Sequence, residues 1–218
     1  MSFAPSAVIF DCGGVLGLPQ DPERASAMAN LCGVPMKMFY GLYIKDRLEL
    51  DRGALSMEEY WSRIFRAVGI TPSRELVAQI EEHDAQGWSG VNQKVVDWSR
   101  ELRAAGLRTA ILSNMPPDKL SFMRASGRFT WIEEFPVAIF SCDCALVKPE
   151  PAIYRLCLER LGARPEECLF LDDMPANIVA ARALGIHAHL FLSAGQAAEE
   201  LRQRWGLPVK SLGEVESG

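Results

Sequence analysis

The sequence predicts an α/β protein built on a doubly wound parallel sheet, with a helical segment inserted into it. Three observations lead to this fold class. Short apolar runs recur along the chain, helical patterns separate most of these runs, and one long stretch, residues 18–88, contains no convincing strand. Continuous apolar runs are typical of strands that are buried on both faces of a parallel sheet.

Five apolar runs are expected to form the strands of this sheet. Most of them are followed directly by a small or acidic residue. Runs of this length suit buried strands better than helices, which need more residues. The five runs are residues 7–10, 109–112, 137–140, 168–171 and 189–192.

Helices are expected between the later strands. Apolar residues follow the helical period over residues 95–102 and 153–161, and Gly106 and Gly162 follow as stops. A third helix opens at Pro175. Strand and helix therefore alternate from about residue 92 to the end, which favours a doubly wound sheet.

The stretch between the first two strands breaks this alternation. Helical stripes occur at residues 61–68 and 76–80, and Gly/Pro clusters at 33–35 and 69–72 punctuate the segment, so about four helices are expected. Open α/β sheets bind ligands outside the carboxyl ends of their strands, where this insert would lie. The predicted domains are an α/β core, residues 1–16 and 90–218, and a helical cap, residues 17–89.

Composition excludes several classes of protein. The 218 residues are 49% apolar and 23% charged, which is ordinary for a globular chain. The net charge of −5 leaves no basic surplus, so no nucleic-acid partner is expected. Residues 1–10 resemble no signal peptide, and no apolar stretch approaches the ~20 residues of a membrane span. We expect a cytoplasmic protein with no membrane partner, whose six cysteines are reduced.

Polar residues stand at the carboxyl ends of the expected strands or just beyond them. Because parallel strands share one carboxyl edge, these residues could converge. A carboxylate there can attack phosphorus, paired acids can hold Mg²⁺, and lysine, hydroxyl and amide groups can hold phosphoryl oxygens. The set is Asp11, Ser113, Asn114, Lys148, Asp172 and Asp173.

Each of these residues alone has an ordinary structural explanation. Asp11 could be a loop or cap residue, and Asp172 or Asp173 could cap the helix that opens at Pro175. Ser113 and its neighbour could form a turn, and a lysine before proline is usually solvated. The order in which all of them occur along the chain is what favours a catalytic site.

In this order the segments resemble the four motifs of the haloacid dehalogenase-like hydrolase superfamily, and the resemblance spans the whole chain. Within it, the first motif resembles a branch of capped phosphatases that includes bacterial sugar-phosphate phosphatases and the N-terminal phosphatase domain of soluble epoxide hydrolase. The resemblance implies a Rossmann-like core with a cap. The motifs are Phe10-Asp11-Cys12-Gly13-Gly14-Val15-Leu16, Leu112-Ser113-Asn114, Val147-Lys148-Pro149 and Leu171-Asp172-Asp173-Met174-Pro175-Ala176-Asn177.

The resemblance also implies a role for each residue. Asp11 would be the nucleophile that forms an aspartyl-phosphate, and Lys148 would neutralise charge between it and the phosphate. Ser113 and Asn114, with Lys148, would bind the phosphoryl group of a small phosphorylated substrate. The implied cofactor is Mg²⁺, with Asp11, the Gly13 carbonyl, Asp172 and Asp173 as its ligands.

One position departs from the superfamily pattern. Most of these phosphatases have an aspartate, the general acid/base, two residues after the nucleophile, where this chain has Gly13. Glycine keeps the backbone carbonyl but cannot transfer a proton, a contribution of typically ~10²–10⁴-fold in rate. Metal binding is therefore expected to survive, while poor leaving groups should react slowly.

Other functions stay open at this point. A 2-haloacid dehalogenase would use the same nucleophile without metal, but Asp172 and Asp173 would repel an anionic haloacid. A phosphotransferase or mutase and a catalytically silent relative are further alternatives. A phosphoryl-responsive receiver domain is disfavoured, because its acidic pair comes early in the chain. Candidates to line the substrate pocket, or else to pack between cap helices, are Met28, Met36, Met38, Phe39 and Tyr40.

Overall fold

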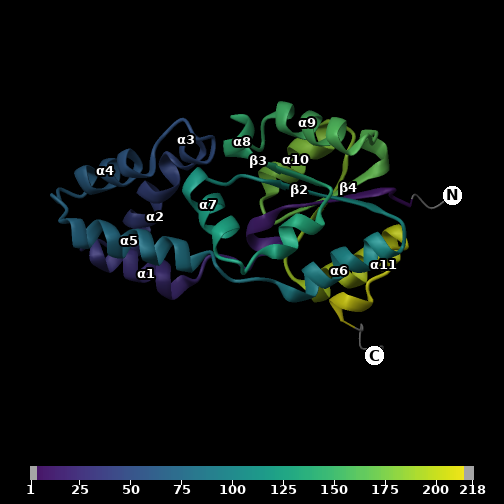
Figure 1. The fold of residues 1–218 in the computed structure, drawn as a ribbon, viewed down its shortest axis with the longest axis horizontal. Helices are drawn as coiled ribbons and strands as arrows, with labels where there is room; N and C mark the ends of the chain where they lie inside the picture. Colours follow the sequence, from purple (N-terminus) through teal and green to yellow (C-terminus); the bar gives the residue numbers. More distant parts are fainter. Residues whose placement is uncertain (1–3, 214–218) are drawn as a thin grey trace.

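The computed structural model describes residues 4–213, in which a parallel sheet forms the centre of an α/β core (Figure 1). Neighbouring strands pair in the order β3-β2-β1-β4-β5, and every pairing is parallel. The chain therefore starts in the middle of the sheet and winds outward in both directions, as the sequence predicts. The strands are β1 (Ala7–Phe10), β2 (Arg108–Ser113), β3 (Val137–Phe140), β4 (Cys168–Asp172) and β5 (His187–Leu190).

All five predicted strands overlap the observed ones, but the fifth was placed two residues too late. The strand runs over His187–Leu190 and not over residues 189–192. The chain leaves the sheet early because Leu192 faces solvent, with 70% of its side chain exposed, and Ser193 caps the next helix. The apolar pattern placed this strand too late because residues 191 and 192 belong to the turn between β5 and the next helix.

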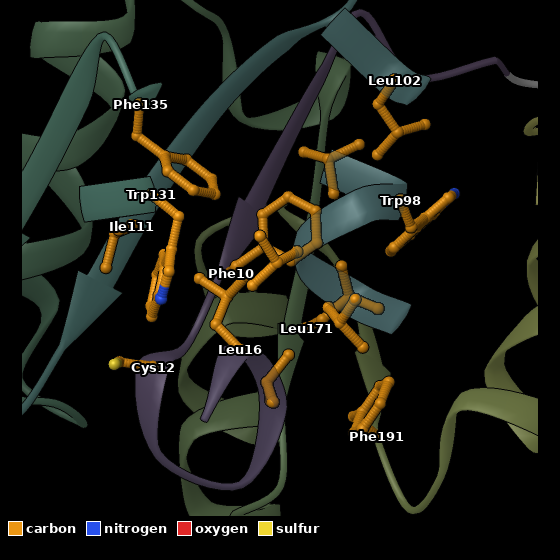
Figure 2. Packing of buried hydrophobic residues seen from close by; sticks show 14 of the residues in the cluster. Phe10, Cys12, Leu16, Trp98, Leu102, Ile111, Trp131, Phe135, Leu171 and Phe191 are labelled. Atoms are coloured by element: carbon orange, nitrogen blue, oxygen red, sulfur yellow. The ribbon is translucent and has the colours of Figure 1, made fainter. Parts of the chain in front are cut away.

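Helices cover both faces of the sheet, and alternate residues of each strand pack against them (Figure 1). On one face, Phe10 packs edge-on against Trp98, with ring centroids 5.4 Å apart, and against Phe135 at 5.9 Å (Figure 2). The flanking helices are α6 (Gln93–Ala104), α7 (Pro117–Ala125) and α11 (Ala194–Trp205) on this face, and α9 (Pro151–Leu161) and α10 (Pro175–Ala183) on the other.

Shorter turns complete the core. Within residues 4–213, a π-helical turn follows β1 directly, and three 3₁₀ segments and one short α-helix lie further along the chain. The π-helical turn matters most here, because it carries the residues that follow Asp11. These segments are Cys12–Leu16, Thr130–Glu134, α8 (Ser141–Cys144), Pro165–Glu167 and Lys210–Leu212.

A helical lobe, residues 22–87, lies beside the core and has its own apolar centre (Figure 1). It has five helices where about four were expected, because the charged segment around residues 45–52 contains a short one. Gly17 and Val91 form an antiparallel bridge where the chain leaves and re-enters the core. The lobe helices are α1 (Pro22–Leu31), α2 (Met36–Lys45), α3 (Arg47–Asp51), α4 (Met57–Ala67) and α5 (Arg74–Gly87).

Specific polar contacts hold the lobe against the core near α3. The guanidinium of Arg52 donates to both carboxylate oxygens of Glu150, at 2.6 and 3.1 Å, and to the carbonyl of Ala145. The hydroxyl of Ser141 donates to the carbonyl of Asp51. These contacts fix one side of the boundary between the two parts.

No disulfide bond links the cysteines within residues 4–213. All six cysteines are free thiols, and four of them are buried, where a thiol packs as a small apolar group. Burial raises the pKa of Cys12 to about 12. Within residues 4–213, no helix combines the length and the apolar character needed to cross a bilayer.

Candidate active site

The polar residues predicted at the strand ends meet at one edge of the sheet. Asp11 directly follows β1, Ser113 ends β2 and Asp172 ends β4, while Lys148 comes from the loop between α8 and α9. All four side chains are buried. The parallel topology brings them together because the carboxyl ends of adjacent strands lie side by side.

Lys148 is the cation at the centre of this group. Its Nζ lies 2.8 Å from Asp11 Oδ1 and 2.7 Å from Asp172 Oδ2. Burial alone would lower the pKa of Lys148, but the two carboxylates outweigh it and hold this pKa above its ordinary value. The lysine is therefore charged throughout the physiological range.

Three carboxylates form what we call the carboxylate cluster: Asp11, Asp172 and Asp173. One oxygen of each lies within 4.8 Å of the others. Burial raises the pKa of Asp11 to about 7; Lys148 opposes this rise, and the two other acids add to it. Three acids against one lysine leave an excess of negative charge. Carboxylate oxygens so placed fit a hard divalent cation such as Mg²⁺, which would favour their ionised forms.

The two adjacent acids of the cluster face different surroundings. Asp172 is fully buried and accepts hydrogen bonds from Lys148, from the Asn177 amide at 3.0 Å and from the Met174 backbone at 2.8 Å. Asp173 is partly exposed and lines a cavity. Neither acid caps α10, whose N-cap is Met174 with no side-chain hydrogen bond. Asp172 therefore positions its neighbours, while Asp173 is available to a ligand.

The Asn114 side chain forms two hydrogen bonds to the backbone of Lys148. Its Nδ2 donates to the Lys148 carbonyl at 2.9 Å, and its Oδ1 accepts from the Lys148 N–H at 2.8 Å. This pair of bonds ties the end of β2 to the loop that carries the lysine. Ser113 is buried beside it, and both residues line the cavity.

The turn after Asp11 explains why residue 14 is a glycine. Asp11 Oδ1 accepts from the Cys12 N–H at 2.6 Å, which orients the carboxylate. Gly14 has φ of 75°, a conformation that favours glycine. A Cβ on Gly14 would also overlap the carboxylate of Asp173. Glycine is thus required both by the backbone and by the approach of an acid.

Trp88 occupies the space beside Gly13. A Cβ on Gly13 would lie 3.4 Å from the indole ring. The Trp88 Nε1 donates to the Tyr43 hydroxyl at 3.2 Å, and the Nζ of Lys119 lies 4.5 Å from the ring centroid. Burial lowers the pKa of Lys119 to about 8. Sequence reasoning missed Trp88 and Lys119, since no motif marks either residue and they meet only in the folded structure.

Most of these groups border one cavity of about 530 Å³ between the lobe and the sheet edge, here called the interlobe cavity. On the lobe side, Arg47 donates to the Tyr43 hydroxyl at 2.7 Å and to Asp51 at 3.0 Å, and the same hydroxyl donates to Asp84 at 2.5 Å. Of the predicted site residues, Asp172 alone does not border the cavity. Those that do are Asp11, Gly13, Ser113, Asn114, Lys148 and Asp173.

Comparison with known proteins gives relatives over most of the chain. A family model described as haloacid dehalogenase-like hydrolase matches residues 5–185. Acyl-CoA dehydrogenase family member 10 of Mus musculus is 38% identical over 217 residues, and the match covers 93% of this chain and 19% of that protein. Bifunctional epoxide hydrolase 2 of Mus musculus is 26% identical over 213 residues, 90% of this chain and 38% of that protein. The chain thus spans only a minor part of these two relatives.

Another relative matches over nearly its whole length, and solved structures share the fold. Sesquiterpene phosphatase astK of Aspergillus oryzae is 23% identical over 204 residues, 92% of this chain and 96% of that protein. A predicted HAD-like family hydrolase from Porphyromonas gingivalis has a TM-score of 0.68 at 27% identity, covering 87% of this chain and 91% of that one. A HAD family enzyme from Bacteroides thetaiotaomicron, solved with magnesium and inorganic phosphate, has a TM-score of 0.63 at 22% identity, with coverage of 85% and 93%.

Proposed function

Because the chain belongs to the haloacid dehalogenase-like hydrolase family, we propose that it is a Mg²⁺-dependent phosphatase of small phosphorylated compounds. The observation that carries this proposal is the carboxylate cluster, with Lys148 in contact with two of its members, at the edge of the interlobe cavity. The existence of a relative named as a phosphatase, and of a solved family enzyme that holds magnesium and phosphate, supports it.

In this proposal Asp11 is the nucleophile. Its carboxylate oxygen forms a bond to phosphorus as the ester P–O bond breaks, which gives an aspartyl-phosphate and an alkoxide leaving group that takes its proton from water. Water then attacks the phosphorus, releases inorganic phosphate and restores the carboxylate. The neighbouring Lys148 offsets charge on the phosphoryl oxygens, and the Ser113 hydroxyl can donate to them.

A Mg²⁺ ion would be held by Asp11 and Asp173, which face the cavity, with the Gly13 carbonyl and Asp172 completing the set. When bound, the ion would draw negative charge from the phosphoryl group and orient it. The residues present fit such an ion, because three carboxylate oxygens approach one another with a single lysine to balance them. Without a metal this arrangement is electrostatically costly.

The lobe would act as a cap, residues 17–89, on a catalytic core, residues 1–16 and 90–218. It covers the strand ends, so it would exclude bulk water from the reacting phosphate. No carboxyl group is available at Gly13 to protonate the leaving oxygen, and Trp88 borders that position. Turnover should therefore depend steeply on the leaving group.

The test is hydrolysis of p-nitrophenyl phosphate. We expect activity that requires Mg²⁺, disappears with a chelator and falls by at least ~10³-fold in Asp11→Asn, because the amide cannot attack phosphorus. Circular dichroism and thermal melting of the variant would confirm that it folds. Hydrolysis that survives the chelator, or near-normal turnover by the variant, would contradict the proposal. Metal-free release of halide from a 2-haloacid would instead assign the dehalogenase alternative.

A further inference from the structure

Helix α2 presents two apolar faces, and only one of them packs inside the lobe. Phe39 and Tyr43 are buried in the lobe centre. Met36, Tyr40 and Ile44 recur every four residues on another face and are 39%, 50% and 50% exposed. All three line the interlobe cavity. Of the five residues suggested from the sequence as pocket-lining, Met28 and Phe39 instead pack in the lobe core.

An apolar side chain from the core faces the same space. Met174 follows Asp173 of the carboxylate cluster, is 54% exposed and lines the interlobe cavity. We call Met36, Tyr40, Ile44 and Met174 the apolar wall. These four are among the ten large hydrophobic side chains that are exposed within residues 4–213. Their gathering at one cavity, rather than scattering over the surface, indicates a ligand-binding surface.

The apolar wall offers little to a polar ligand. Met36, Ile44 and Met174 carry no side-chain donor that could bind a sugar hydroxyl. Arg47, a lobe cation that borders the cavity, is engaged by Asp51 and by the Tyr43 hydroxyl. A hydroxyl-rich ligand would therefore lose hydrogen bonds to water on entering this part of the cavity without recovering them.

One cavity thus joins a charged end to an apolar side, and its ligand should match both. We propose that the leaving group of the substrate carries a hydrocarbon chain, so that the enzyme acts on alkyl phosphate monoesters in preference to phosphorylated sugars. The phosphate would lie at the carboxylate cluster and the chain along the apolar wall. This inference rests on the proposed function, which it deepens by naming the substrate class.

The first experiment measures kcat/KM for n-alkyl phosphates from ethyl to octyl phosphate. The leaving alcohols are nearly equal in acidity, so changes along the series report contact with the enzyme rather than chemistry. We expect kcat/KM to rise about two- to fourfold per methylene until the cavity is full. Hexyl phosphate and glucose 6-phosphate are both primary phosphates with six carbons, so they form a matched pair. We expect kcat/KM for hexyl phosphate to exceed that for glucose 6-phosphate by about 100-fold.

A matched pair of variants assigns the effect to the wall. Ile44→Asn replaces a wall residue with a polar one of similar size and should reduce the gain per methylene to less than twofold. Leu192→Asn makes the same kind of change at a residue that is more exposed and does not border the cavity. It should leave the chain-length dependence as in the wild type.

Binding of n-alkylphosphonates, followed by calorimetry, separates this inference from the proposed function. These probes cannot be hydrolysed, so affinity that strengthens with chain length supports the hydrocarbon site even in a protein that fails to turn over p-nitrophenyl phosphate. Flat affinity and flat kcat/KM along both series would overturn the inference while leaving a working phosphatase in place. A change of oligomeric state in Ile44→Asn, measured by light scattering, would mean that the wall pairs two copies of the chain and would equally overturn it.

Discussion

Two lysines face the interlobe cavity from different regions, and their surroundings could hardly differ more. Lys148 lies at the sheet edge with a carboxylate on either side, at 2.7 and 2.8 Å. Lys119 lies on α7, a helix of the core, and its Nζ lies 4.5 Å from the centroid of the Trp88 ring. No carboxylate within residues 4–213 forms a salt bridge with Lys119.

The comparison shows that partners, and not burial, decide the charge of a lysine. Burial opposes ionisation of both residues. The pKa of Lys148 nevertheless lies above its ordinary value, because two acids face it, whereas the pKa of Lys119 is lowered to about 8. An aromatic face attracts a cation much more weakly than a desolvated carboxylate does. The charged form of Lys148 thus stabilises the folded site, whereas the buried charge of Lys119 destabilises it.

The largest effect is expected when Lys148 is removed. Lys148→Met leaves Asp11 and Asp172 buried together without a cation, so unfolding should become easier by about 3–5 kcal/mol. Catalytic activity should also be lost. Because removal of the neighbouring cation would raise the pKa of Asp11 further above its value in the unfolded chain, the defect should grow as pH increases from 5 to 8. Urea denaturation of both proteins across this range measures it.

A Lys148→Met protein as stable as the wild type at pH 8 would contradict the assigned role. The double variant Lys148→Met with Asp172→Asn is the control, since it removes one of the stranded charges. It should recover part of the lost stability but no activity. Equal stability of the single and double variants would show that the acids do not depend on this lysine.

A second, smaller effect sharpens the description of the charged end. Gly14→Ala adds a methyl group that overlaps the Asp173 carboxylate and strains a backbone with φ of 75°. We expect a loss of about 1–3 kcal/mol in stability and at least tenfold weaker Mg²⁺ binding, measured by calorimetry. Gly41→Ala is the control, because a Cβ there meets nothing within 4 Å and the residue lies inside α2. That change should be neutral or stabilising, and equal losses in both variants would refute the proposed contact.

The charged end could be predicted from the sequence for a physical reason. Strands buried on both faces appear as continuous apolar runs, and parallel pairing then brings their carboxyl ends to one edge. Asp11, Ser113 and Asp172 needed no further information to be grouped. The same reasoning failed at the fifth strand, because the run at residues 189–192 continues past the last pairing into the turn before α11.

The other sides of the cavity could not be predicted, because they depend on how separate helices pack. The stripe of Met36, Tyr40 and Ile44 has the same period as a buried face, so the pattern alone does not tell which face of α2 meets the cavity. Trp88 follows α5 and Lys119 lies on α7, and the two residues meet only in the folded structure. The structural role of Asn114 could not be predicted either, because its hydrogen bonds to the Lys148 backbone form only when that loop is folded.

The smallest effect should have the opposite sign. Lys119→Met removes a poorly paired charge, so the protein should become more stable at neutral pH. A pKa lowered from 10.5 to about 8 corresponds to at most about 3 kcal/mol, and partial exposure reduces this to roughly 1–2 kcal/mol. Exposed Lys37 provides the control, because Lys37→Met should change stability by less than about 0.5 kcal/mol.

The pH dependence gives this prediction its sharpest test. Between pH 8 and 10.5 the unfolded chain keeps its proton on Lys119 while the folded chain has lost it, so this residue makes wild-type stability rise with pH. The advantage of Lys119→Met over the wild type should therefore be fully present at pH 7 and shrink toward pH 10. Groups that do not interact with Lys119 cancel in the difference between the two urea-denaturation curves. If Lys119→Met is less stable than the wild type at pH 7, the aromatic ring compensates the buried charge after all, and the contrast with Lys148 disappears.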